Sequence, residues 1–145
     1  MDDSRLVLVI EDSPADVRLI KEALRDSGLH VTLEIAQDGE QALNFLNREG
    51  PFGNARRPSL ILLDLNLPQG TSKEILRFIK SDPGLRAIPV AVLTSSNAEG
   101  DIREVYELHA NCYLRKPIDL DSFVATIRST ISFWLGVACV PAEGR

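Results

Sequence analysis

The chain is poor in the features that mark secreted and membrane proteins. It has 145 residues and only two cysteines, Cys112 and Cys139, too few for a disulfide framework or a cysteine-ligated metal site. No apolar run approaches the roughly 20 residues of a membrane-spanning helix. The acidic start MDDSRLVLVI has too short an apolar part for a signal peptide. These absences predict a protein of the reducing cytoplasm.

Positive charge is also scarce. The 16 Lys and Arg residues are outnumbered by 21 Asp and Glu residues, which gives a net charge of −5. Binding to nucleic acid without sequence preference requires a basic face that replaces counterions, and docking on an anionic membrane requires positive charge as well. Neither partner is expected. The length and the hydrophobic content of 44% suit one globular domain with its own core.

Five apolar, strand-like runs alternate with five amphipathic, helix-like stretches. The strand-like runs are residues 6–10, 31–36, 59–65, 88–94 and 112–116. Several are almost entirely apolar, which is typical of strands buried on both faces of a parallel sheet. Helices are predicted after Ser13-Pro14, after Asp38, from Ser72 to Lys80, from Ala98 to Leu108, and from near Asp119. The alternation predicts an α/β fold, a doubly wound five-stranded parallel sheet with five helices.

Polar residues stand where the predicted strands end, and ligands of such sheets bind beyond those carboxyl ends. The residues are Glu11, Asp12, Asp64, Thr94 and Lys116. Two like charges about 4 Å apart repel by roughly 4 kcal/mol at an effective dielectric near 20, so three clustered acids require a cation. An all-oxygen site suits Mg²⁺ or Mn²⁺. Beside such a metal, Asp64 is a candidate phosphoryl acceptor, and Lys116 and the Thr94 hydroxyl are candidates to bind phosphate oxygens.

Four segments carry these residues: VIEDSPADVRLIKEAL, LILLDLNLPQG, VAVLTSSN and ANCYLRKP. With them the chain resembles, from end to end, the receiver domain of two-component response regulators. The resemblance implies the flavodoxin-like strand order 2-1-3-4-5 and Asp64 as the phosphoacceptor. It also implies a Mg²⁺ (or Mn²⁺) held by Asp12, Asp64 and the backbone carbonyl of Asn66, with Glu11 acting through a water.

The same resemblance implies a switch. Thr94 and Tyr113 are the switch pair, Lys116 binds the phosphoryl group, and the peptide bond between Lys116 and Pro117 is cis. The donor is a sensor histidine kinase, a separate protein, because neither His30 nor His109 lies in a histidine-kinase-like context. Phosphorylation then remodels a surface that binds a downstream protein, which the sequence does not identify.

Some positions depart from the family pattern. Ser72 stands where many receivers have glycine, so the loop after the third strand is expected to differ in shape. His109 precedes the fifth strand in place of glycine and is expected to end a helix in the left-handed conformation. Asn66 and Ser96 occupy positions that, in the family, tune loss of the phosphoryl group.

A narrower resemblance comes from the insert NREGPFGNARRPS before the third strand and from the ending FWLGVACVP. Both are similar to single-domain regulators that partner phytochrome-type histidine kinases. We therefore expect one receiver domain over residues 1–145, with a C-terminal extension at about 133–145 and no output domain. An apolar cluster in the extension is the predicted homodimer face, unless it folds back on its own domain: Phe133, Trp134, Leu135 and Val137.

Two other functions fit parts of the pattern. A haloacid-dehalogenase-type phosphatase also uses an aspartate after a buried strand, but it requires a second acid two residues on, where this chain has Asn66. A binding or dimerisation module that works without phosphorylation would not require the complete acidic and lysine set. The leading expectation is a signalling phosphoacceptor that catalyses only its own phosphorylation and dephosphorylation, and not a turnover enzyme.

Overall fold

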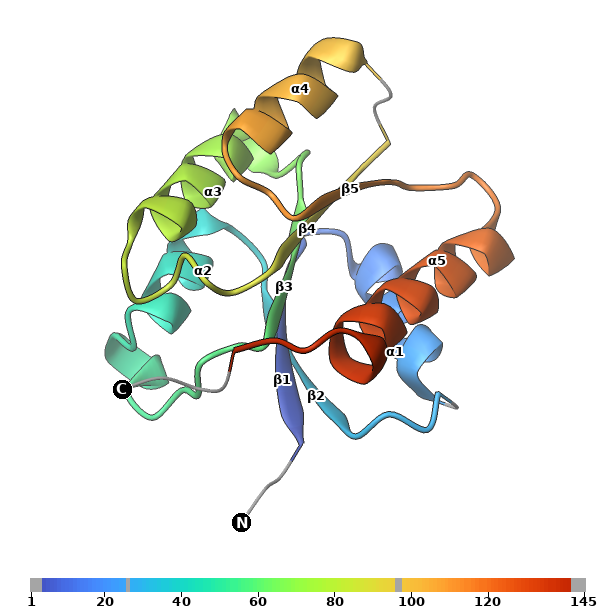
Figure 1. Cartoon of the computed structure of the whole chain (residues 1–145), viewed down its shortest axis with the longest axis horizontal. Coiled ribbons are helices and arrows are strands. Elements are labelled where there is room, and N and C mark those ends of the chain that lie inside the picture. Colours follow the sequence, from blue (N-terminus) through green and yellow to red (C-terminus); the bar gives the residue numbers. More distant parts are fainter. Residues whose placement is uncertain (1–3, 26, 96–97, 142–145) are drawn as a thin grey trace.

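The computed structural model describes residues 4–25, 27–95 and 98–141 and contains one parallel sheet (Figure 1). Its strands are β1 Arg5–Ile10, β2 Val31–Ala36, β3 Leu60–Asp64, β4 Val90–Thr94 and β5 Cys112–Arg115. All neighbouring strands pair in parallel in the order β2-β1-β3-β4-β5, which confirms the predicted fold. The central strands β3 and β4 are buried at every position, as their apolar sequences predict.

The helices of the described residues follow the predicted alternation. They are α1 Pro14–Arg25, α2 Gly39–Leu46, α3 Ser72–Ser81, α4 Glu99–Glu107 and α5 Leu120–Ser132. Three short segments were not predicted, η1 Gly50–Phe52, η2 Pro68–Gly70 and the π-helical η3 Phe133–Val137. Within the described ranges, no helix is long and apolar enough to cross a bilayer.

Side chains at the helix starts satisfy backbone amides that have no partner within the helix. The Asp38 carboxylate accepts from the amide of Gln41 at 2.8 Å, and the Asp119 carboxylate accepts from Ser122 at 2.8 Å. Ser13 accepts from the Asp16 amide at 3.2 Å. All three helix starts were predicted, because Ser and Asp are favoured at the N-cap position, where their side chains accept from free backbone amides.

Helices cover both faces of the sheet. Figure 1 shows α1 and α5 on one face and α2, α3 and α4 on the other. Successive side chains of a strand point to opposite faces, so Leu8 and Ile10 join the core under α2 to α4, whereas Val7 and Val9 join the core under α1 and α5. The two cores fix the height of each strand, and therefore the position of the residue at its carboxyl end.

The end of α4 confirms the role predicted for His109. This residue has φ 72°, in the left-handed region, and its amide donates to Tyr106 O at 2.9 Å. The Ala110 amide donates to Val105 O at 3.2 Å. These two bonds form a Schellman motif, the helix end that most often uses glycine. His109 is therefore a structural residue of the chain turn into β5.

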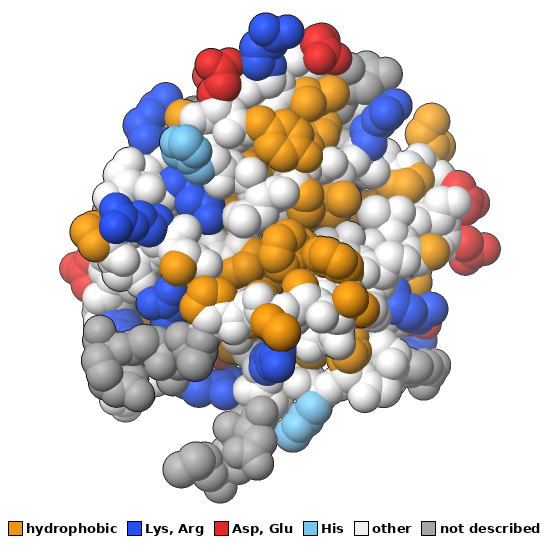
Figure 2. All heavy atoms as spheres, viewed as in Figure 1, with side chains coloured by type: hydrophobic (Ala, Val, Ile, Leu, Met, Phe, Trp, Pro, Cys, Tyr) orange, Lys and Arg blue, Asp and Glu red, His pale blue; other side chains and the backbone are white. Residues whose placement is uncertain are grey.

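The C-terminal segment corrects part of the predicted dimer face. Leu135 is only 8% exposed and packs in the core under α1 and α5, and its carbonyl accepts from Arg5 Nη1 at 2.9 Å. It therefore cannot serve as a dimer contact. Phe133 and Val137 are 50% and 74% exposed, and the half-buried Trp134 ring lies 5.3 Å from the Phe133 ring. Figure 2 shows hydrophobic side chains gathered over the C-terminal end of α5 and the segment after it.

Candidate functional site

Three carboxylates meet at the carboxyl edge of the sheet. Glu11 and Asp12 directly follow β1, and Asp64 is the last residue of β3. One carboxylate oxygen from each lies within 4.8 Å of the others. Glu11 is 1% and Asp64 is 3% exposed, whereas Asp12 is exposed. The cluster sits where strand order reverses on either side of β1, the usual position of ligand sites in these sheets.

Lys116 is the cation of this cluster. Its Nζ lies 3.0 Å from Glu11 Oε1, 2.8 Å from Asp16 Oδ2 and 3.5 Å from Asp64 Oδ1. The Lys116 amide donates to Thr94 O at 2.7 Å, which places the residue directly after β5 and beside β4. Burial alone would lower the pKa of Lys116, but hydrogen bonds to Asp16 and Glu11 outweigh it, so the pKa is raised. Lys116 is therefore fully charged at neutral pH.

Burial and the clustering of the acids raise the pKa of Glu11. Burial, together with the neighbouring Asp64, raises the pKa of Glu11 from 4.5 to about 8, although Lys116 acts in the opposite direction. Its other carboxylate oxygen accepts from the Ser13 amide at 3.3 Å. One lysine does not compensate three clustered carboxylates, and the site favours a further cation.

The peptide bond between Lys116 and Pro117 corrects another expectation. Among the described residues no peptide bond is cis, so this bond is trans and the predicted cis peptide is wrong. Lys116 reaches Glu11 and Asp16 from the trans backbone because its amide is anchored on Thr94 and its side chain has four methylene groups. A trans X–Pro bond is also the intrinsically favoured isomer, by about 0.5–1 kcal/mol.

Asn66 links the end of β3 to the end of β4. Its amide donates to Asp64 Oδ1 at 3.0 Å, and its Nδ2 donates to Thr94 Oγ1 at 3.3 Å. Thr94 is fully buried and pairs with β5 through Arg115. The contact between the Asn66 side chain and Thr94 was not predicted, since it depends on the path of the loop after β3.

Asp16 was also missed by sequence reasoning. It lies in the first turn of α1, and its carboxylate makes the shortest contact to Lys116 Nζ. Its position could have indicated this role, because Asp16 follows Asp12 by four residues and lies in the first turn of the helix that begins beside the site. The structure therefore brings a third carboxylate to the same lysine, besides those of Glu11 and Asp64.

Ser72 explains how the loop after β3 is closed. It is 1% exposed, its hydroxyl donates to Asp64 O at 2.6 Å, and the same oxygen accepts from the Leu67 amide at 3.4 Å. The serine therefore ties the start of α3 to the residue that ends β3. A glycine at this position would lack both bonds.

Replacing Ser72 by alanine is expected to lower the free energy of unfolding by about 1–3 kcal/mol, because the buried Asp64 carbonyl loses a donor. Chemical denaturation of the variant measures this loss. Ser81→Ala removes a hydroxyl from an exposed position at the end of the same helix and should change stability by less than about 0.5 kcal/mol. Equal stability of the two variants would contradict the role assigned to Ser72.

The predicted switch residues lie in different environments. Thr94 belongs to the buried end of β4, whereas Tyr113 is half-buried on β5 and packs against the core under α2 to α4. The Tyr113 amide donates to the Tyr106 hydroxyl at 3.2 Å, which ties β5 to α4. Ser96, predicted to tune loss of the phosphoryl group, lies outside the described residues.

The donor set of the cluster fits a hard divalent cation. Glu11, Asp12 and Asp64 offer only carboxylate oxygens, and two of the three are almost completely buried. Mg²⁺ and Mn²⁺ prefer carboxylate and water oxygens, whereas zinc and copper prefer the nitrogen and sulfur ligands that this cluster lacks. The exposed Asp12 leaves the site accessible from solvent on one side.

Comparison with known proteins agrees with this geometry. Residues 7–128 match the response regulator receiver domain family. The response regulator Rcp1 of Synechocystis sp. is 45% identical over 138 residues, which cover 95% of this chain and 94% of Rcp1. The probable methanogenesis regulatory protein FilR2 of Methanothrix harundinacea is 38% identical over 136 residues, covering 93% of this chain and 86% of FilR2.

Solved structures give the same result. The Mn²⁺-bound form of Rcp1 superposes with a TM-score of 0.90 and covers 95% of this chain and 99% of that chain at 45% identity. The phosphorylated cyanobacterial phytochrome response regulator RcpA superposes with a TM-score of 0.91, 96% and 99% coverage and 43% identity. The chain therefore belongs to the response regulator receiver domain family of two-component signal transduction.

Proposed function

We propose that the chain accepts a phosphoryl group on Asp64 from a histidine kinase. The observation that carries the proposal is the convergence of Glu11, Asp12, Asp64 and Lys116 at one edge of the sheet. Asp64 is held rigidly, because β3 is buried at every position and the Asn66 amide orients its carboxylate. A fixed carboxylate beside a charged lysine can both attack phosphorus and stabilise the charge that is transferred.

The transfer requires little more than positioning. An Asp64 oxygen attacks the phosphorus of the phosphorylated kinase histidine, an oxygen–phosphorus bond forms, and the phosphorus–nitrogen bond breaks with the imidazole as leaving group. Lys116 binds one phosphoryl oxygen and the Thr94 hydroxyl donates to another. A bound Mg²⁺ or Mn²⁺ supplies neutralising charge there. Asp12, Asp64 and the Asn66 carbonyl would hold this ion directly, and Glu11 would hold it through a water.

The signal would leave the site through Thr94 and Tyr113. Thr94 already contacts Asn66, which contacts Asp64, so a phosphoryl group on Asp64 would recruit the Thr94 hydroxyl. Tyr113 would then move into the vacated space, and its bond to Tyr106 would carry the change to α4. The remodelled surface of α4, β5 and α5 would bind the downstream protein.

The relatives suggest where this chain acts. RcpA is a phytochrome response regulator, and we propose a phytochrome-type photoreceptor kinase as the partner of this chain as well. The chain would act in the cytoplasm and would also catalyse loss of its own phosphoryl group. The exposed Phe133 and Val137, with the half-buried Trp134, would form a homodimer face.

Borohydride mapping tests the assignment of Asp64. An aspartyl phosphate is an acyl phosphate, which borohydride reduces to homoserine. After incubation with acetyl phosphate and Mg²⁺, we expect homoserine at position 64 and no modification when a chelator replaces the metal. Reduction at another carboxylate, or multiple-turnover hydrolysis of a phosphate monoester, would contradict the proposal.

A further inference from the structure

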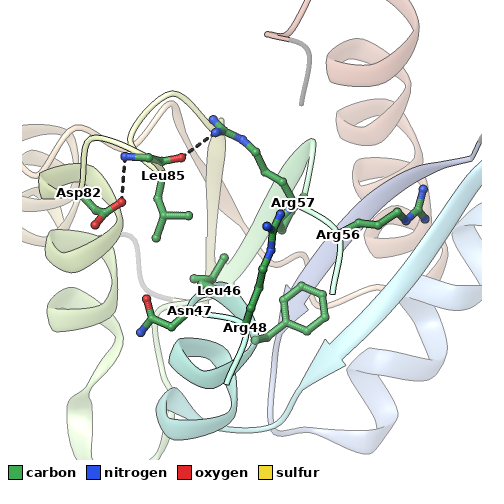
Figure 3. A pocket seen from close by; sticks show the side chains of 10 residues that line it. Leu46, Asn47, Arg48, Arg56, Arg57, Asp82 and Leu85 are labelled. Carbon is green, nitrogen blue, oxygen red and sulfur yellow. Dashed lines mark hydrogen bonds between the residues drawn. The ribbon is translucent and has the colours of Figure 1, made fainter. Parts of the chain in front are cut away.

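The insert between α2 and β3 forms a cavity of about 310 Å³ that plays no part in the site described above. Its walls come from the end of α2, from the residues just before β3 and from the turn after α3 (Figure 3). The strands are parallel and Asp64 stands at the carboxyl end of β3, so this cavity lies at the opposite edge of the sheet. The volume is at the lower end of the range for small-molecule sites, about 300–1,000 Å³.

Positive charge is concentrated at this cavity although the whole chain is acidic. Arg48, Arg56 and Arg57 line it, and the insert region therefore gathers three of the chain's 16 Lys and Arg residues. The carboxylate of Asp82 also lines the cavity and accepts from the Gly84 amide at 2.9 Å. Neighbouring guanidinium groups repel one another, and an anion placed between them removes this repulsion.

The arginine side chains are placed differently. Arg57 Nη1 donates to Gly84 O at 2.6 Å, which fixes its guanidinium group over the cavity. Arg56 Nη1 donates to Ser4 O at 2.7 Å, and Figure 3 shows this side chain pointing away from the other two. Arg48 extends from the end of α2 toward Arg57. Arg48 and Arg57 are therefore the pair that faces the cavity.

The backbone of Arg48 is costly for an arginine. Its φ is 56°, in the left-handed region. The Arg48 amide donates to Phe45 O at 3.1 Å and the Glu49 amide donates to Asn44 O at 2.8 Å. These bonds form a Schellman motif, in which glycine is usual at the position of Arg48. A residue with a Cβ loses roughly 1–2 kcal/mol in this conformation. Arg48 is exposed there, so packing does not account for the side chain.

Apolar side chains form part of the remaining wall, beside the polar Asn47 and Asp82. Phe45 and Leu46 are 5% and 8% exposed, and Pro58 is buried beside them. A ligand with an anionic head and a small apolar body matches both parts of the cavity.

We propose that this cavity binds a small organic oxyanion, a phosphate or carboxylate group attached to an apolar group. Arg48 and Arg57 bind the oxyanion through charge-assisted hydrogen bonds, and Phe45, Leu46 and Leu85 contact the apolar part. The site is independent of phosphorylation at Asp64.

Nuclear magnetic resonance titration with phenyl phosphate and with phenylacetate tests this site on the ¹⁵N-labelled full chain. No divalent cation is added, which disfavours phosphate binding at Asp64. We expect saturable shifts of the Asn47, Gly84 and Leu85 amides with at least one probe, and the tighter probe identifies the head group. Shifts confined to Asn66 and Lys116, or no saturable shift with either probe, would overturn the proposal.

Single arginine variants separate a specific site from general charge. Arg48→Gln and Arg57→Gln are each expected to weaken binding about tenfold, the loss of one charge-assisted hydrogen bond. Arg103→Gln removes the same charge from an exposed position on α4 and should leave the affinity unchanged. Equal weakening by all three variants would show that only net charge matters. The spectra themselves report whether each variant is folded.

Discussion

Replacing Asp64 by asparagine is expected to abolish labelling by a small phosphodonor in the presence of Mg²⁺. The amide keeps the size of the carboxylate but has no anionic oxygen to attack phosphorus. Glu11 and Asp12 are not expected to replace it, because in the proposed mechanism they hold the metal ion, Asp12 directly and Glu11 through a water. Intact-mass measurement should show one added phosphoryl group on the wild type and none on the variant.

Two controls accompany this experiment. Asp121→Asn changes an exposed aspartate on α5 and should be labelled like the wild type. Asp64→Asn should be at least as stable as the wild type in metal-free buffer, since one charge of a repelling cluster is removed. Equal labelling of Asp64→Asn and the wild type would contradict the assignment of the phosphoacceptor.

The strands could be predicted almost to the residue. The run 31–36 is β2 without change, and the runs 59–65 and 88–94 are longer than β3 and β4 by one or two residues at their ends. Apolar composition marks a buried strand, but pairing with neighbours decides where it begins and ends. The site residues at strand ends followed directly, because parallel strands bring their carboxyl ends to one edge.

Contacts between distant segments were the part that the sequence did not reveal. The bond between Asp16 and Lys116 joins residues 100 positions apart and depends on how α1 and β5 pack around the sheet. The Asn66 side chain reaches Thr94 for the same reason. Leu135 is a different case, because Ile127, Ile131 and Leu135 follow one another at helical spacing and all lie in one core. Its burial was predictable from that periodicity.

Replacing Lys116 by methionine is expected to make the stability of the domain depend on divalent cations. The lysine side chain is 14% exposed and contacts three carboxylates, so its loss leaves buried negative charge without a cation. Removal of one partner of a buried ion pair costs about 3–5 kcal/mol. In metal-free buffer, chemical denaturation should show a loss of this size. Lys73→Met is the control, because Lys73 pairs with half-exposed acids on α4 and should cost less than about 1 kcal/mol.

The same variant should bind Mg²⁺ or Mn²⁺ more tightly than the wild type, because a positive charge that competes with the metal is gone. Stability lost in metal-free buffer should therefore return as the ion is added.

The stability loss of Lys116→Met should also shrink as pH falls. The pKa of Glu11 is about 8 in the folded chain against 4.5 in its ordinary state, so the folded state takes up a proton before the unfolded state does. Removal of Lys116 raises this pKa further, since Lys116 lowers it.

Repulsion from Glu11 is thus greatest above about pH 8 and is relieved toward about pH 5. Titration of Lys116 does not contribute between about pH 5 and pH 8, because the raised pKa of Lys116 keeps it charged at every pH below its ordinary value of 10.5. Denaturation of the wild type and of Lys116→Met at both pH values, with and without Mg²⁺, measures the two effects separately. A deficit independent of pH and of the metal would mean that Lys116 acts through packing and not through charge.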